Sequence, residues 1–230
     1  MADKRLRLIS SKSMTGDLFA DELPLAGERM SLGPQSVVLR GFALTFIDEL
    51  WPRLQQVLTQ APFRHMVTPG GQTMSVPLTN CGPLGWTSSR AGYRYRSDDP
   101  DSGLPWPAMP AVFMRLATEA AAAAGFAGFA PDACLINRYR PGSRLTLHQD
   151  RNERDFSQPI VSVSLGVSAV FLWGGLQRAG GTQRMALFHG DVAVWGGVDR
   201  MRYHGIAPIR EGSHALTGSE RINFTFRKAG

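Results

Sequence analysis

Residues 144–150 read R-L-T-L-H-Q-D, a stretch that carries side chains able to bind a metal. A strand repeats every two residues, so Thr146, His148 and Asp150 are expected on one face and the leucines on the other. A distant string, M-R-Y-H, adds His204. Two imidazoles and one carboxylate on one side of an iron ion leave its other positions open, as binding of both a co-substrate and O₂ requires. His148, Asp150 and His204 are therefore candidate iron ligands.

Other interpretations of these residues remain open at this stage. His189, in F-H-G-D, competes with His204 as the third ligand, although the following Gly190-Asp191 indicates a tight turn. The pattern H-x-D also fits a surface strand with a local ion pair. His65 and His214 are expected to be ordinary polar histidines.

The last predicted strand, R-I-N-F-T-F-R at 221–227, has one apolar and one polar face. The polar face carries Arg221, Asn223, Thr225 and Arg227. Two guanidinium groups are costly to bury without anionic partners. The strand A-C-L-I-N-R-Y at 133–139 places Leu135, Asn137 and Tyr139 on one face in the same way. A small dianion held among these strands would explain the pattern, and the alternative is a solvent-facing strand with unrelated arginines.

The elements that position these residues are mainly strands. From residue 133 onward, short β-rich runs are separated by Gly, Pro and Asp, the rhythm of a sandwich or jelly roll. Helical spacing of apolar residues predicts one helix over 42–58, with a kink or a second start at Pro52, and another over 110–124. The segment between these helices is rich in turn residues and aromatics, which is typical of a binding flap.

Composition predicts one domain of an ordinary globular protein. The chain has 230 residues, 43% of them hydrophobic, and only two cysteines, so we expect a reducing compartment and no disulfide framework. No apolar stretch reaches the length of a bilayer span, which predicts a cytoplasmic protein with no membrane partner; a transit peptide is the alternative. The net charge of +6 is compatible with a phosphate-bearing partner. Residues 1–35 are expected to be a disordered basic extension ahead of a single domain over 36–230.

Nine motifs resemble the iron(II) and 2-oxoglutarate dependent dioxygenases, and within them the AlkB-type DNA-alkylation repair family. The resemblance runs from about Ser36 to Lys228. The motifs, in family order, are P-F-R-H-M-V-T-P-G-G, T-M-S-V, T-N-C-G-P-L-G-W, P-D-A-C-L-I-N-R-Y, L-H-Q-D, P-I-V-S-V-S-L-G, H-G-D-V-A-V-W-G-G, Y-H-G-I-x-P and R-I-N-F-T-F-R.

The resemblance implies roles for individual residues. His148, Asp150 and His204 would hold the iron. Arg221, with Asn137 and Tyr139, would bind the distal carboxylate of 2-oxoglutarate, and Arg227 would pair with the carboxylate nearer the metal. Asn223 and Trp195 would line the same pocket. The substrate-binding residues implied in this way are Thr68, Met74, Trp86, Tyr93, Tyr95, Arg151, Asn152 and Trp195. An extruded base would stack between Trp86 and His148, although Trp86 also fits a role in the core.

Two positions depart from the family pattern. Gln72 follows T-P-G-G where relatives have an aromatic residue, which puts a phosphate-side contact in question. Arg151 and Asn152 stand where relatives often have a lysine and a second aspartate, so a carboxylate facing the substrate is missing unless Glu153 supplies it.

The resemblance implies a mainly β fold with supporting helices, a double-stranded β-helix (jelly roll) with an N-terminal nucleotide-recognition lid at 68–95. The implied activity is oxidative demethylation of 1-methyladenine and 3-methylcytosine in single- or double-stranded DNA, with RNA left open. We expect the protein to be a monomer. Iron(II), 2-oxoglutarate and O₂ would be required, and formaldehyde, succinate and CO₂ released. Alternatives are the same iron chemistry on a protein or small molecule, and a non-catalytic metal- or nucleic-acid-binding module.

Overall fold

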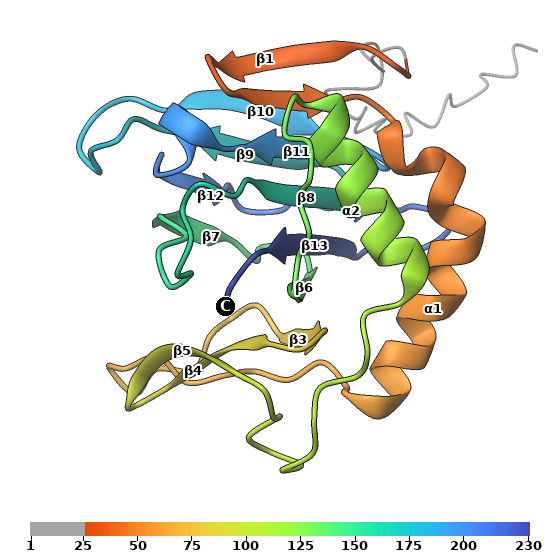
Figure 1. Cartoon of the computed structure of the whole chain (residues 1–230), viewed down its shortest axis with the longest axis vertical. Coiled ribbons are helices and arrows are strands. Elements are labelled where there is room, and N and C mark those ends of the chain that lie inside the picture. Colours follow the sequence, from red (N-terminus) through yellow and green to blue (C-terminus); the bar gives the residue numbers. More distant parts are fainter. Residues whose placement is uncertain (1–25) are drawn as a thin grey trace, which may run out of the picture.

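Two antiparallel sheets form the body of the computed structural model, which describes residues 26–230 (Figure 1). The larger sheet has the strand order β1 (Arg29–Gly33), β2 (Ser36–Leu39), β11 (Val192–Trp195), β8 (Ile160–Gly166), β13 (Arg221–Arg227), β6 (Ala133–Tyr139), β3 (Leu78–Cys81). The smaller has the order β10 (Gln183–Leu187), β9 (Ala169–Trp173), β12 (His204–Ile206), β7 (Leu145–His148). From β6 to β13 the chain crosses repeatedly between the two sheets, which confirms the predicted jelly roll.

Two helices cover the outer face of the larger sheet (Figure 1). The first predicted helix is a 3₁₀ turn, η1 (Phe42–Phe46), followed by α1 (Ile47–Gln60). Pro52 lies inside α1, so the conformation changes before the proline rather than at it. The second, α2 (Ala111–Ala123), follows Pro110 and ends before Gly125, which has a φ of 95° that favours glycine.

The core consists of two main layers of buried apolar side chains. One lies between the helices and the larger sheet and includes Phe113, Phe224 and Phe226. The other contains residues of both sheets, among them Phe171 and Trp195, and closes the interior of the jelly roll. Among the helices of residues 26–230, none is long and apolar enough to cross a membrane.

Three segments differ from the predicted organisation. Strand β1 lies within the expected disordered extension and pairs with β2, so folded structure begins before Ser36; residues 1–25 lie outside the described part of the chain. Strand β3 lies within the predicted lid but is the edge strand of the larger sheet, which leaves the hairpin of β4 (Gly85–Ser89) and β5 (Gly92–Arg96) as a separate unit. Strand β12 was not predicted, because three residues are too few to show a period.

Candidate metal and co-substrate site

His148, Asp150 and His204 come together at one end of the smaller sheet. His148 ends β7 and His204 begins β12, and the two are directly opposite in the register of these strands. The Nε2 atom of His148 lies 3.8 Å from Oδ1 of Asp150, and that of His204 lies 3.7 Å from Oδ2. One possible ligand atom from each residue falls within 4.8 Å of the others. The structure therefore assembles a donor set of two imidazoles and one carboxylate.

Backbone contacts orient both imidazoles toward this centre. Nδ1 of His148 lies 2.9 Å from the carbonyl oxygen of Thr146, and Nδ1 of His204 lies 3.0 Å from that of Arg202. A ring that donates its Nδ1–H to a carbonyl presents an unprotonated Nε2, the form that a metal requires. Gly205 allows β12 to approach β7 closely, since a Cβ there would lie 2.6 Å from the carbonyl oxygen of Leu145.

The electrostatic environment keeps His148 and Asp150 in the protonation states that bind a metal. Burial, followed by the charge of His204, lowers the pKa of His148 to about 4, so the ring is neutral at pH 7. Burial alone raises the pKa of Asp150, but Arg227 and the two histidines together hold that pKa well below its usual value. Arg227 donates from Nε and Nη2 to Oδ2 of Asp150, at 3.1 and 2.9 Å. Metal binding would thus need little proton release from His148 and Asp150.

A buried guanidinium group with unused donors lies deeper in the jelly roll. Arg221 is 1% exposed, and its Nη2 donates to the hydroxyl of Ser164 at 2.9 Å. Its Nε and Nη1 have no hydrogen-bond partner among residues 26–230. Tyr139, opposite it on β6, lies under the guanidinium at 5.1 Å from ring centroid to Cζ. Unpartnered buried donors are costly, so this group is suited to binding an anion such as a carboxylate.

Asn137 and Asn223 are opposite each other on β6 and β13, two residues along the strands from the Arg221–Tyr139 pair. Asn223 donates to the hydroxyl of Ser162 and to the carbonyl of Val163, at 2.9 and 2.8 Å, so its amide hydrogens are already engaged within the sheet. Ser162 and Ser164 were missed in the sequence. Their signal is two serines at a spacing of two in the apolar strand I-V-S-V-S-L-G.

Two indole rings form a wall beside His204. The predicted Trp195 has its ring centroid 4.8 Å from that of His204. Trp173, which the sequence interpretation did not single out, is opposite His204 in the strand register and lies 6.3 Å away. Both Nε1 atoms are buried and lack a hydrogen-bond partner in the described part of the chain. No sequence signal marks Trp173, because only the pairing of β9 with β12 shows that it lies opposite His204.

The β4–β5 hairpin brings several predicted substrate-binding residues together. Trp86 stacks on Tyr93, with ring centroids 5.4 Å apart, and is directly opposite Tyr95. Met74 and Trp86 both pack against a small apolar cluster of Met66, Leu78 and Leu135. Trp86 also donates from Nε1 to Oδ1 of Asn152 at 3.2 Å.

Thr68, Arg151 and His189 form no hydrogen bond or ion pair with this hairpin. Thr68 closes a turn, where its hydroxyl accepts from the backbone N–H of Gln72 at 3.1 Å. Arg151 is exposed and forms no ion pair with a residue of 26–230. His189 pairs with His214 at a centroid distance of 4.1 Å, outside the His148, Asp150 and His204 cluster.

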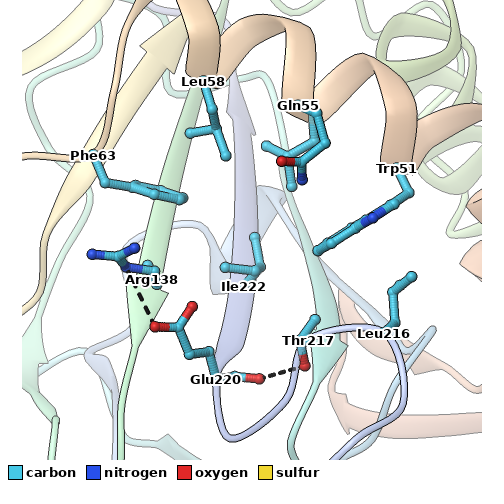
Figure 2. Close-up of a pocket in the computed structure, with 10 residues that line it drawn as sticks. Trp51, Gln55, Leu58, Phe63, Arg138, Leu216, Thr217, Glu220 and Ile222 are labelled. Carbon is cyan, nitrogen blue, oxygen red and sulfur yellow. Dashed lines mark hydrogen bonds and ion pairs between the residues drawn. The ribbon is translucent and has the colours of Figure 1, made fainter.

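A hollow lies on the helix-covered side of the larger sheet, the side that faces away from the smaller sheet (Figure 2). It measures about 250 Å³ and lies between α1 and β13, with Trp51, Phe63 and Ile222 among its lining residues. None of the predicted site residues lines it. Alternation along β13 explains the separation, because Ile222 and Arg221 point to opposite faces.

A jelly roll that encloses two histidines, one carboxylate and buried arginines defines the class of non-haem iron oxygenases. The 2OG-Fe(II) oxygenase superfamily matches residues 37–227. The alpha-ketoglutarate-dependent dioxygenase AlkB of Salmonella typhimurium (strain LT2) is 55% identical over 93% of this chain and 97% of that protein. The chain belongs to this superfamily and, within it, to the AlkB dioxygenases.

More distant relatives extend this likeness. The nucleic acid dioxygenase ALKBH1 of Mus musculus is 38% identical over 51% of this chain and 31% of that protein. The structure of OsALKBH1 matches with a TM-score of 0.76 and 27% identity, over 87% of this chain and 100% of that one. The chain is an iron(II) and 2-oxoglutarate dependent dioxygenase, and iron(II), 2-oxoglutarate and O₂ are its family's requirements, as predicted.

Proposed function

We propose that this dioxygenase removes methyl groups from N-alkylated bases, such as 1-methyladenine and 3-methylcytosine, in DNA and also in RNA. The observation that carries the proposal is the position of the aromatic β4–β5 hairpin beside the His148, Asp150 and His204 cluster. Asn152, which follows Asp150 closely in the chain, accepts a hydrogen bond from Trp86 of this hairpin. Base–aromatic stacking is worth about 1 to 3 kcal/mol in single-strand binders. A net charge of +6 favours a polyanionic substrate.

His148, Asp150 and His204 fit iron(II), because two imidazoles and one carboxylate leave room for further ligands. Arg221 fits the distal carboxylate of 2-oxoglutarate, since two of its donors have no partner among the described residues. Tyr139 and Asn137 border that position, and Arg227 serves the carboxylate nearer the metal. When bound, iron(II) with 2-oxoglutarate and O₂ supplies the oxidation, in which the methyl carbon leaves as formaldehyde and the keto acid becomes succinate and CO₂.

The protein's own residues bind, orient and enclose the reactants in this scheme. Trp86 stacks on the extruded base, and damaged bases that pair poorly cost less to extrude. Tyr93, Tyr95 and Met74 complete the hairpin side of the base pocket, with Thr68, Arg151 and Asn152 at its margin. Trp195 and Asn223 line the co-substrate side and exclude water. The hairpin and the preceding loop act as the nucleotide-recognition lid.

The test is mass spectrometry of methylated oligonucleotides incubated with the full chain, iron(II), 2-oxoglutarate and ascorbate. We expect the oligonucleotide to lose the mass of the methyl group, with one succinate formed per base repaired. With the His148→Ala variant, the mass of the oligonucleotide should not change. Turnover of oligonucleotides should fall with rising salt, whereas turnover of the free nucleoside should not. Succinate formation without any demethylated oligonucleotide would instead indicate a protein or small-molecule substrate.

We further infer a monomer that acts on single- and double-stranded substrates in the cytoplasm. Sedimentation of the full chain with and without a methylated duplex tests the first two statements, and cell fractionation tests the third. A stable dimer, or binding to single strands alone, would contradict them.

A further inference from the structure

Two adjacent residues that follow the metal-binding strand both contact the β4–β5 hairpin. Trp86 donates from Nε1 to Oδ1 of Asn152 at 3.2 Å. Tyr95 donates from its hydroxyl to Oε1 of Glu153 at 2.6 Å. Trp86 and Tyr95 are directly opposite each other in the hairpin, so the two bonds fasten a single rung of it.

Glu153 is itself fixed on its other side by two arginines. The residue is 6% exposed, and its Oε2 pairs with Nη2 of Arg200 at 3.1 Å, while Oε1 lies 3.5 Å from Nε of Arg227. Arg200 also donates to the backbone carbonyl of Asp150 at 2.7 Å, and Arg227 binds the Asp150 carboxylate. The acceptor for Tyr95 therefore belongs to the same charged network as the metal-binding carboxylate.

The same contacts show whether Glu153 can replace the aspartate that relatives often have at the position of Asn152. Both of its oxygens are engaged, one by Tyr95 and one by Arg200. Burial raises the pKa of Tyr95 well above its usual value, so its hydroxyl stays protonated and acts as the donor. Glu153 is thus oriented inward and is not free to pair with a substrate.

The hairpin depends on such side-chain bonds because it pairs with no other strand of the described chain. A two-stranded ribbon is marginally stable by itself. On the β4 side, the amide of Asn80 binds both backbone groups of Trp86 at 3.0 Å, and the hydroxyl of Ser88 donates to Val67 at 2.7 Å. On the β5 side, Tyr95 provides the bond to the segment that follows Asp150.

We propose that Asn152 and Glu153 are positioning residues that clamp the hairpin to the metal-binding segment, Asn152 through Trp86 and Glu153 through Tyr95. The clamp sets how far the aromatic rings of the hairpin stand from the histidine cluster. The clamp proposal rests on the proposed function at one point, because it takes the hairpin to form one wall of the base pocket.

Hydrogen exchange of the full-length, metal-free chain tests the clamp without any substrate. Tyr95→Phe removes only the hydroxyl, and we expect the amides of residues 85–96 to exchange about ten- to a hundredfold faster, as for the loss of one charge-assisted hydrogen bond. Asn152→Ala, at an exposed position, should accelerate them by about fivefold. Tyr93→Phe is the matched control, since that ring is 48% exposed and its hydroxyl has no hydrogen bond to a described residue.

A second comparison separates positioning from a general structural role. Glu153→Gln keeps the shape of the side chain but loses its charge. Combined with Tyr95→Phe, it should accelerate hairpin exchange no further than Tyr95→Phe alone, because Glu153 acts on the hairpin through that hydroxyl. The clamp would be overturned if the double variant exchanged faster than Tyr95→Phe by the full factor of Glu153→Gln alone. Unchanged exchange in Tyr95→Phe would also overturn it.

Kinetics connect the clamp with the base pocket. In Tyr95→Phe and Asn152→Ala, KM for a methylated oligonucleotide should rise about five- to tenfold with kcat changed less than twofold, and 2-oxoglutarate affinity of the Mn(II)-loaded protein should stay the same. Altered exchange with no oligonucleotide turnover even in the wild type would reject the proposed function and leave the clamp. Normal oligonucleotide turnover with unaltered exchange would reject the clamp alone.

Discussion

The molecule contains two close pairs of histidine rings, and they differ in what surrounds them. His148 and His204 have ring centroids 4.5 Å apart, and His189 and His214 have centroids 4.1 Å apart. The first pair has Asp150 between its Nε2 atoms. Within residues 26–230, no ion pair joins the second pair to a carboxylate, and its two Nδ1 atoms accept from the backbone N–H groups of Gly166 and Leu216.

The comparison shows that closeness of imidazoles does not by itself make a metal site. In both pairs, burial lowers the pKa of one member, His148 or His189, to about 4. Only the first pair has a nearby carboxylate held by Arg227 and lies beside the two indole rings of Trp173 and Trp195. The distinguishing features are the carboxylate and the buried arginines.

The largest expected difference concerns catalysis. His148→Ala, Asp150→Ala and His204→Ala should each abolish turnover and weaken binding of Mn(II) as a probe, because each removes one of three ligands. His189→Ala should spare both. Turnover per enzyme and Mn(II) titration by calorimetry provide the measurements. Full activity of the His204 variant with loss in the His189 variant would identify the second pair as the source of the third ligand.

The next effect concerns Arg221, which we propose binds the distal carboxylate of 2-oxoglutarate. Arg221→Ala removes a charge-assisted pair worth about 1.5 to 3 kcal/mol, so affinity for 2-oxoglutarate should fall about ten- to a hundredfold. Binding of DNA should hardly change. Arg140→Ala is the control, because Arg140 is exposed and pairs with Glu220. Isothermal titration with the Mn(II)-loaded protein measures both, and an unaltered affinity in Arg221→Ala would remove that residue from the pocket.

The two pairs should also respond differently to pH and metal. Unfolded histidine has a pKa near 6.5, so between pH 6.5 and about 4 the unfolded chain binds more protons than the fold does at His148 and His189. The metal-free protein therefore loses stability as pH falls through this window. Between pH 6.5 and pH 4, the Tm of His148→Gln and of His189→Gln should each fall about 2 to 4 °C less than the Tm of the wild type. This difference corresponds to about 1 kcal/mol in the free energy of unfolding, which is the size expected for partly exposed rings.

Metal distinguishes the two variants in the same thermal scans. Mn(II) should raise the Tm of His189→Gln as it does that of the wild type, because a ligand that binds only the fold stabilises it. It should not raise the Tm of His148→Gln. Equal stabilisation of both variants would show that His148 is not a ligand.

The smallest expected effect concerns the hairpin side of the first pair. Asn152 keeps an acceptor oxygen but no charge, and Glu153 is already paired with Arg200. Asn152→Asp should therefore raise the preference for the cationic 3-methylcytosine over the neutral 1-methylguanine by about 1 kcal/mol, or about fivefold. The ratio of kcat/KM in matched oligonucleotides measures this preference, and an unchanged or lower ratio in the variant would contradict it.

Strand patterns predicted much of the fold and of the metal centre. Alternation in R-I-N-F-T-F-R separated Arg221 from Phe224 correctly, because a strand with a period of two gives its faces different neighbours. The same rule placed His148 and Asp150 together. Local spacing is sufficient for such statements, since adjacent residues of one strand share a geometry that does not depend on the rest of the chain.

The sequence by itself determined the jelly-roll class, the ligand types and the family. The resemblance to the family already favoured His204 over His189, but local strand spacing left both open, and only the tertiary structure shows the pairing of β12 with β7 that places His204 opposite His148. It also decided that Glu153 is oriented inward to Tyr95 and Arg200, and that Trp173 lies beside His204. These contacts join residues far apart in the chain, so their partners are set by strand register and packing, which no local pattern encodes.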